Sequence, residues 1–209
     1  MILIAGGSGL IGKAIGDSFG TKHLVYNYDL KVSETKHHIF FDAHEPLIAH
    51  LSRNACNIET FIDCARYKSQ ADQIATWETV ISYFKSRERE HGNMILFSSI
   101  YGHKAPRFGI YYATNVPETP LSYAMDKAAV EQATKFLAEK YKKWNIRVNC
   151  IAPGGVFNGH SKDFQEHYML AGGVPMIQTK NLIPVINMLT DDDNVINGQV
   201  ISVEGGWTL

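Results

Sequence analysis

The sequence predicts a single α/β domain built on a doubly wound parallel β-sheet with helices on both faces. Two observations lead to this fold class. Short runs of β-branched and aromatic residues alternate with longer amphipathic stretches along the 209 residues. The chain also begins with an apolar run, a glycine cluster and a helical pattern. With 45% hydrophobic residues, one domain over residues 1–209 has enough apolar surface for a sizeable core.

The N-terminal segment combines a strand over residues 1–5 with a glycine-rich turn, after which a helix opens at Lys13 and stops near Gly20. Glycines let the backbone approach a pyrophosphate, and the following helix N-terminus faces its negative charge. Tight turns also use glycine, but the flanking strand and helix favour a Rossmann-type dinucleotide site. The residues expected to form it are Gly6, Ser8, Gly9, Leu10, Ile11 and Gly12.

A second predicted strand, residues 24–28, ends at Asp29. A carboxylate about 20 positions beyond the glycines can accept hydrogen bonds from the adenosine ribose hydroxyls and would repel a 2′-phosphate. The position therefore favours NAD over NADP. NADP stays open, because Asp29 also fits the start of a turn and Lys31 is close enough to compensate a phosphate.

Three further strands and two helices continue the alternation. The predicted strands cover residues 39–41, 60–65 and 94–97, and the predicted helices cover residues 47–51 and 70–89. The last of these strands delivers Ser98 and Ser99 to its C-terminal edge. Ligands bind at that edge in an open parallel sheet.

The longest predicted helix runs from Leu121 to Trp144 and carries Tyr123 and Lys127 four residues apart on one face. Lowering a tyrosine pKa from about 10 to about 7 requires roughly 4 kcal/mol. An ammonium about 5 Å away supplies roughly 3 kcal/mol at an effective dielectric near 20. The pair can therefore act as a tuned acid/base, although the spacing alone also fits an ordinary surface pair.

The C-terminal third contains a buried strand over residues 146–151, a polar stretch over residues 157–173, a helix over residues 181–189 and a last strand over residues 199–203. His160 and His167 lie in the polar stretch without a third convergent ligand or a glutamate at helical spacing. We therefore expect no metal site.

Taken together, several segments resemble the short-chain dehydrogenase/reductase family over essentially the whole chain. These segments are residues 6–12, 42–43, 98–102, 123–127, 146–154, 196–199 and 204–207. The resemblance implies an NAD(P)-dependent oxidoreductase that transfers hydride between nicotinamide and a carbonyl or secondary alcohol.

By this resemblance Ser99 would orient the substrate oxygen, Tyr123 would be the acid/base, and Lys127 would lower the tyrosine pKa and hold the nicotinamide ribose. The segment from Pro153 to Val156 would hold the carboxamide, and Asp42 with Ala43 would border the adenine. The full set expected to bind the cofactor is Gly6, Ser8, Gly9, Leu10, Ile11, Gly12, Asp29, Asp42, Ala43, Cys64, Ala65, Tyr123, Lys127, Pro153, Gly154 and Val156.

The chain also departs from the family pattern. Its glycine spacing is typical of the extended, sugar-nucleotide branch, which favours an NAD-retaining epimerase or dehydratase as an alternative. The segment 63–66 reads Asp-Cys-Ala-Arg where the family usually has Asn-Asn-Ala-Gly, and the region after it is short. The asparagine that holds a proton-relay water is therefore not assigned. A non-catalytic nucleotide-binding sensor is the second alternative.

An insertion over residues 103–120 separates Ser99 from Tyr123 and offers hydrogen-bonding and ring-stacking groups for a polyhydroxylated ligand. A loop that only packs over the helix is the alternative. The stretch resembles family members associated with bacterial flagellin and surface-glycan (nonulosonate-type) pathways, which implies a sugar-like substrate. The polar stretch 157–173 sits where the family places a mobile substrate lid.

Composition limits the partners. A formal net charge of −1 favours neither nucleic acid nor an anionic membrane, and no apolar run reaches the length of a signal peptide or a membrane span. Three cysteines without C-x-x-C spacing, at positions 56, 64 and 150, indicate reduced thiols in a cytoplasm. We expect a homo-oligomer, a dimer or tetramer, because the predicted helix over residues 121–144 carries more apolar surface than one sheet face can cover. That surface comprises Ala129, Phe136, Leu137, Tyr141 and Trp144.

Overall fold

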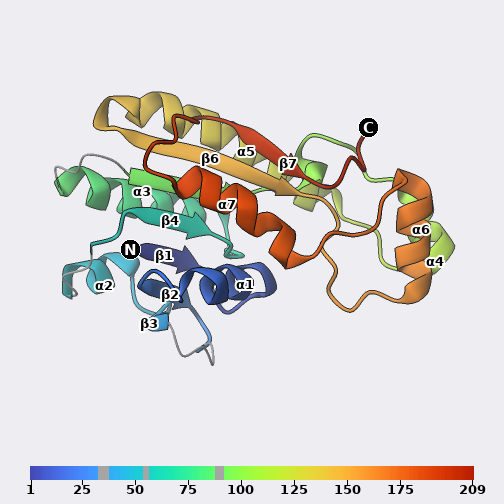
Figure 1. The fold of residues 1–209 in the computed structure, drawn as a ribbon, viewed down its shortest axis with the longest axis horizontal. Coiled ribbons are helices and arrows are strands. Elements are labelled where there is room, and N and C mark those ends of the chain that lie inside the picture. The colour runs from blue at the N-terminus through green and yellow to red at the C-terminus, as the bar shows by residue number, and fades with distance from the viewer. Residues whose placement is uncertain (33–37, 54–56, 88–91) are drawn as a thin grey trace.

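The computed structural model describes residues 1–32, 38–53, 57–87 and 92–209 (Figure 1). Its strands form one parallel sheet in the order β3-β2-β1-β4-β5-β6-β7. The strands are β1 (Ile2–Ala5), β2 (Val25–Asp29), β3 (His38–Asp42), β4 (Thr60–Asp63), β5 (Gly92–Phe97), β6 (Ile146–Pro153) and β7 (Val200–Val203). The strand order reverses between β1 and β4, which is the switch point of a doubly wound sheet. The predicted fold class is confirmed.

Helices cover both faces of the sheet. The α-helices of the described residues are α1 (Leu10–Phe19), α2 (Leu47–Arg53), α3 (Gln70–Ser86), α4 (Phe108–Thr114), α5 (Leu121–Tyr141), α6 (Lys162–Gly172) and α7 (Ile183–Thr190), of which α4 and α6 lie beyond the sheet. One apolar cluster joins α2, α3 and α5 to the sheet, and a second joins α1 and α7 to the opposite face. Both faces of the central strands are therefore buried.

The side chains of β5 show why its sequence is continuously apolar from Met94 to Phe97. Met94 and Leu96 belong to the cluster under α3 and α5, whereas Ile95 and Phe97 belong to the cluster under α1 and α7. Successive residues of a strand point to opposite faces, so a strand covered on both sides needs apolar residues at every position.

A third cluster lies beyond the sheet. Figure 1 shows α4 and α6 together at one end of the molecule, and they contact each other. The buried members of this cluster are Ile100, Ile110, Tyr111, Phe164, Tyr168 and Trp207. The prediction of a simple loop over residues 103–120 is therefore wrong in part, because α4 forms there and buries Ile110 and Tyr111. The polar stretch 157–173 likewise contains α6, whose N-terminus is capped by Ser161.

Several boundaries differ from the predicted ones. Helix α1 begins at Leu10 rather than Lys13, because Gly9 occupies the N-cap and its carbonyl accepts from Lys13 N at 2.8 Å. Helix α5 ends at Tyr141 and continues only as the 3-10 turn Lys142–Trp144. The end of the predicted helix 70–89 and Cys56 lie outside the described residues. Cys64 and Cys150 are free thiols.

The apolar surface of α5 is divided between the core and solvent. Leu137 and Tyr141 pack in the cluster under α5, whereas the Phe136 side chain is 61% exposed. Part of the surface expected to support assembly is therefore used by the chain itself, and the homo-oligomer stays a prediction. Among the helices in the described ranges, none has both the length and the hydropathy needed to cross a membrane.

Replacing Leu96 by alanine should lower the free energy of unfolding by about 2–5 kcal/mol, because its side chain is fully buried in the central strand and would leave a cavity. Urea unfolding of the variant and the parent measures the change. Leu170→Ala is the matched control, since Leu170 on α6 is 77% exposed and should change the free energy by at most about 0.5 kcal/mol. Equal effects of the two variants would contradict the assignment of the core.

Candidate active site

The glycine turn packs directly against the end of β4. Gly6 has φ of +73°, and a Cβ added there would lie 2.7 Å from the backbone of Ala65. A Cβ on Gly12 would collide with the Gly6 carbonyl oxygen. The turn is closed by a hydrogen bond from Gly9 N to Gly6 O at 3.1 Å. The packing therefore requires glycine at both positions, and it brings Ala65 to the N-terminus of α1 at the C-terminal edge of the sheet.

Asp29 holds the end of β2 against this turn. Its Oδ2 accepts from Ser8 N at 2.9 Å, and its Oδ1 accepts from Lys31 N at 3.2 Å. The next strand joins the same corner, because Ala43 N donates to Asp29 O at 2.9 Å. The Asp42 carboxylate is bound by His44, whose backbone N–H lowers the pKa of Asp42 most strongly. The structure thus places the predicted glycine turn, Asp29 and the Asp42-Ala43 segment next to one another at the sheet edge.

Ser99, Tyr123 and Lys127 meet where β5 ends and α5 begins. Ser99 caps the 3-10 turn Ile100–Gly102, and its Oγ accepts from the N–H of Tyr101 at 3.2 Å. The Ser99 side chain also lies close enough to the Tyr123 phenol to lower its pKa. The Lys127 Nζ donates to Phe97 O at 3.0 Å and lies 5.7 Å from the centre of the Tyr123 ring. These side chains form one constellation at the sheet edge.

The protonation of the pair differs from the sequence prediction. Tyr123 is 38% exposed, and the partial burial of its phenol raises its pKa; this outweighs the lowering effects of Ser99 and of the Arg66 charge. Burial also lowers the pKa of Lys127, while the charge of Asp63 acts in the opposite direction. The expected lowering of the tyrosine pKa by Lys127 is therefore not found, because the ammonium is bound to a backbone carbonyl and the phenol is desolvated. A raised pKa keeps the phenol protonated at neutral pH.

A buried network that the sequence analysis missed supports this constellation. The Ser98 Oγ donates to the Lys127 backbone carbonyl at 2.9 Å and lies 3.0 Å from Glu131 Oε1. The same carboxylate oxygen lies 2.8 Å from His103 Nδ1. His103 Nε2 in turn lies 3.3 Å from Ser202 Oγ on β7. The one sequence signal was a glutamate four residues after Lys127, on the face of the helix predicted to be buried.

Asp63 organises the segment that departs from the family pattern. Its buried carboxylate accepts from Ala65 N at 3.1 Å, from Tyr67 Oη at 3.1 Å and from Trp77 Nε1 at 2.6 Å. Burial is the largest influence on this group and raises the pKa of Asp63. The aspartate thus fixes the segment after β4, in which Cys64 and Ala65 were expected to face the cofactor.

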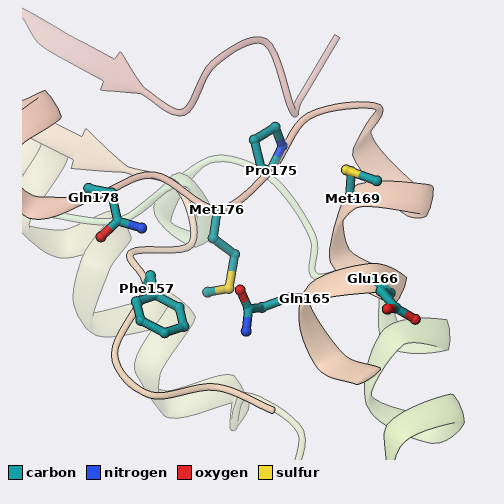
Figure 2. A pocket seen from close by; sticks show the side chains of 7 residues that line it. All are labelled: Phe157, Gln165, Glu166, Met169, Pro175, Met176 and Gln178. Atoms are coloured by element: carbon teal, nitrogen blue, oxygen red, sulfur yellow. The ribbon is translucent and has the colours of Figure 1, made fainter. Parts of the chain in front are cut away.

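The predicted carboxamide segment follows β6. Gly154 N donates to Val203 O at 3.0 Å, and Val156 pairs with Ile177 as an isolated parallel bridge. A cavity of about 240 Å³ lies beside this bridge, between α6 and the chain before α7 (Figure 2). Figure 2 shows Gln165 and Met176 pointing toward each other in it. Its lining residues are Phe157, Gln165, Glu166, Met169, Pro175, Met176 and Gln178.

The insertion contributes hydroxyl groups near the constellation. Tyr111 Oη lies 3.0 Å from Tyr101 Oη and 2.9 Å from Thr119 Oγ1. Tyr111 acts electrostatically on Tyr123 and raises its pKa. Other polar residues of the insertion have structural roles: the Arg107 guanidinium stacks 4.4 Å above the Trp207 ring, and Thr114 Oγ1 donates to Ile110 O.

In the part of the chain that the structure describes, no group of three His, Cys, Asp or Glu side chains is placed to hold a metal ion.

The raised pKa of Tyr123 predicts that its phenol ionises above its ordinary value of 10.0 in the free protein. Burial favours the neutral form, so no phenolate should form at this position near pH 7. An ultraviolet difference titration of the parent against Tyr123→Phe isolates the signal of this one tyrosine. A midpoint near pH 7 would contradict the conclusion that burial sets the pKa of Tyr123. It would instead support the lowering of this pKa by Lys127.

Comparison with known proteins gives concordant matches. A family model described as enoyl-(acyl carrier protein) reductase matches residues 80–208. The chain is 30% identical over 131 residues to the post-translational flagellin modification protein A of Campylobacter coli, which covers 62% of this chain and 50% of that protein. It is 39% identical over 95 residues to the chloroplastic NADPH-dependent aldehyde reductase 2 of Arabidopsis thaliana. This match covers 42% of this chain and 35% of that protein. The matched parts thus span half or less of these relatives.

Solved structures show the same fold. A short-chain dehydrogenase of Leptospira borgpetersenii serovar Hardjo-bovis, with bound NAD+, is similar with a TM-score of 0.86. It is 24% identical, and the alignment covers 100% of this chain and 92% of that chain. The family model alone accounts for more than half of the sequence, including α5 and its Tyr123 and Lys127. The chain belongs to the short-chain dehydrogenase/reductase family.

Proposed function

We propose that the protein is an NAD-dependent oxidoreductase that transfers hydride between nicotinamide and a carbonyl or secondary alcohol, with Tyr123 as the acid/base. The observation that carries this proposal is the constellation of Ser99, Tyr123 and Lys127 at the sheet edge that also holds the glycine turn. The relatives named above are reductases, dehydrogenases or a modification protein, which agrees with this class. A cytoplasmic location is part of the proposal.

The residues at the edge fit a dinucleotide. Gly6 and Gly12 let the turn pack tightly at the sheet edge, so a pyrophosphate can approach the backbone N–H groups at the N-terminus of α1 there. Asp29 lies at the end of β2, and each of its oxygens retains acceptor capacity beyond the single N–H that it binds. These are the groups that an adenosine ribose and a pyrophosphate require.

When bound, nicotinamide supplies the hydride donor or acceptor. The chain supplies the proton, and a neutral Tyr123 phenol has it available for the carbonyl oxygen in the direction of reduction. The Ser99 hydroxyl, whose influence already reaches that phenol, would orient the same oxygen. Lys127 uses one of its three N–H donors on Phe97 O, so two remain for a ribose hydroxyl.

The substrate that we propose is sugar-like. The cavity beside Val156 combines the amides of Gln165 and Gln178 with apolar walls from Phe157 and Met176. Amides can bind hydroxyl groups, and the apolar walls can pack against the C–H groups of a sugar ring. Both amides are partly committed. Gln165 Nε2 donates to the His160 carbonyl at 2.8 Å, which leaves its oxygen as an acceptor for the ligand, and the Gln178 side chain accepts from the backbone N–H of Asn181 in a capping box.

NAD(H) should raise the melting temperature more than NADP(H) at equal concentration, because Asp29 favours free ribose hydroxyls and binding stabilises the native state by mass action. Asp29→Asn should narrow the difference, since it removes the charge that opposes a 2′-phosphate. Asp17→Asn on the exposed face of α1 is the control and should preserve it. Equal or greater protection of the parent by NADP(H) would overturn the cofactor assignment.

Tyr123→Phe should reduce turnover by about 10²–10⁴ and leave the NAD affinity nearly unchanged, because the hydroxyl is used mainly in the transition state. Tyr112→Phe is the matched control, since Tyr112 is 71% exposed on α4 and should retain turnover. Ser99→Ala should depress turnover without changing NAD binding, whereas Lys127→Ala should weaken NAD binding through the lost ribose contact.

Calorimetric NAD titrations and single-turnover absorbance assays with a panel of oxidised and reduced sugars measure these effects. A sensor would bind NAD in the parent and in all three variants alike, without hydride transfer to any substrate. An epimerase or dehydratase that retains NAD, favoured by the glycine spacing, would convert its substrate without net change in nicotinamide absorbance. Undiminished turnover by Tyr123→Phe would exclude its role as the acid/base.

A further inference from the structure

Arg66 stands in the segment after β4 and has no role in the function proposed above. The backbone on either side of it is fixed. Ala65 packs against Gly6 and donates its N–H to Asp63, and the Tyr67 hydroxyl donates to the same carboxylate. The two bonds hold the chain at positions 65 and 67, so position 66 is a defined point on the C-terminal edge of the sheet.

The same segment is tied to the catalytic helix. Gln70 at the start of α3 donates from Nε2 to Asp126 Oδ1 at 3.1 Å. Asp126 lies between Tyr123 and Lys127 in the sequence, on the first turns of α5. Residue 66 therefore lies between the glycine turn on one side and the first turns of α5 on the other.

The charge of Arg66 is not matched within the described chain. No hydrogen bond or ion pair joins its side chain to another described residue, and the side chain is exposed. The carboxylates of the neighbouring segments are engaged elsewhere. Asp63 is buried and binds Ala65, Tyr67 and Trp77, and Asp126 accepts from Gln70.

The guanidinium is close enough to the reacting group for its charge to be felt there. The charge of Arg66 lowers the pKa of Tyr123. An unmatched cation near the phenol would also meet a substrate whose carbonyl oxygen approaches the phenol. Arginine presents a planar fork of N–H donors that fits the two oxygens of a carboxylate or phosphate.

We propose that Arg66 binds an anionic group of the substrate, a carboxylate or a phosphate, beside the carbonyl or alcohol on which Tyr123 acts. The inference rests on the proposed function and narrows its substrate to an acidic or phosphorylated compound. Arg66 is then a specificity-determining residue, supplied by the position at which the family usually has glycine.

Thermal unfolding with inorganic phosphate as the probe tests this site. The parent, Arg66→Gln, Arg66→Lys and the control Lys68→Gln are compared with saturating NAD and without it, at ionic strength held constant with sodium chloride. Lys68 is an exposed cation in the same segment, so its variant removes an equal charge. Phosphate should raise the melting temperature of the parent and of Lys68→Gln.

Arg66→Gln should lose this effect, because a charge-assisted contact of this kind changes affinity by about tenfold or more. Arg66→Lys should retain part of it, since lysine keeps the charge without the planar fork. NAD affinity, measured by calorimetry in all four proteins, should stay the same.

The other outcomes overturn the inference. If phosphate did not raise the melting temperature of the parent, or if Lys68→Gln lost this rise as fully as Arg66→Gln, Arg66 would contribute only to a diffuse surface charge and would form no anion site. A loss of NAD affinity in Arg66→Gln would assign the guanidinium to the pyrophosphate of the dinucleotide. If the parent binds no NAD, the proposed function fails, and the phosphate series without NAD still decides whether Arg66 forms an anion site.

Discussion

The site depends on the reciprocal tie between β5 and α5. The Lys127 ammonium donates to the last carbonyl of the strand, and the Lys127 carbonyl accepts from the Ser98 hydroxyl one residue further on. Both the side chain and the backbone of Lys127 thus bind the first turns of α5 to the end of β5. Ser99 follows Ser98, and Tyr123 lies one turn before Lys127. The tie therefore places Ser99 close to Tyr123 despite the long insertion between them.

Burial has a common effect on the ionisable groups behind this tie. It raises the pKa of Tyr123 and Asp63, lowers the pKa of Lys127, and raises the pKa of the Cys150 thiol to about 12. Each shift favours the uncharged form. The interior behind the sheet edge is therefore poor in charge, and charged groups at its mouth act over a longer range than they would in water.

Local sequence patterns were sufficient for the parts of the fold and site that depend on neighbouring residues. The glycine turn, the helix carrying Tyr123 and Lys127, and Ser99 at a strand end follow from spacing and periodicity. Features set by distant partners did not follow. Helix α4 forms because Tyr111 packs near Phe164 of α6, and the pKa of Tyr123 depends on residues distant in the sequence, among them Ser99 and Arg66. The partners of Glu131 are Ser98, directly after β5, and His103, directly after the 3-10 turn, and they were likewise not evident from the sequence.

The third apolar cluster divides the molecule into parts with separate packing. Its buried residues, among them Ile110, Phe164 and Trp207, belong to neither of the clusters that hold the sheet. Substitutions at distant sites without shared partners have nearly additive effects on stability. Residues of α4 and α6 can therefore diverge while the sheet and its glycine turn are maintained. Over evolutionary time, this arrangement lets one scaffold acquire new ligand preferences through changes confined to a peripheral pair of helices.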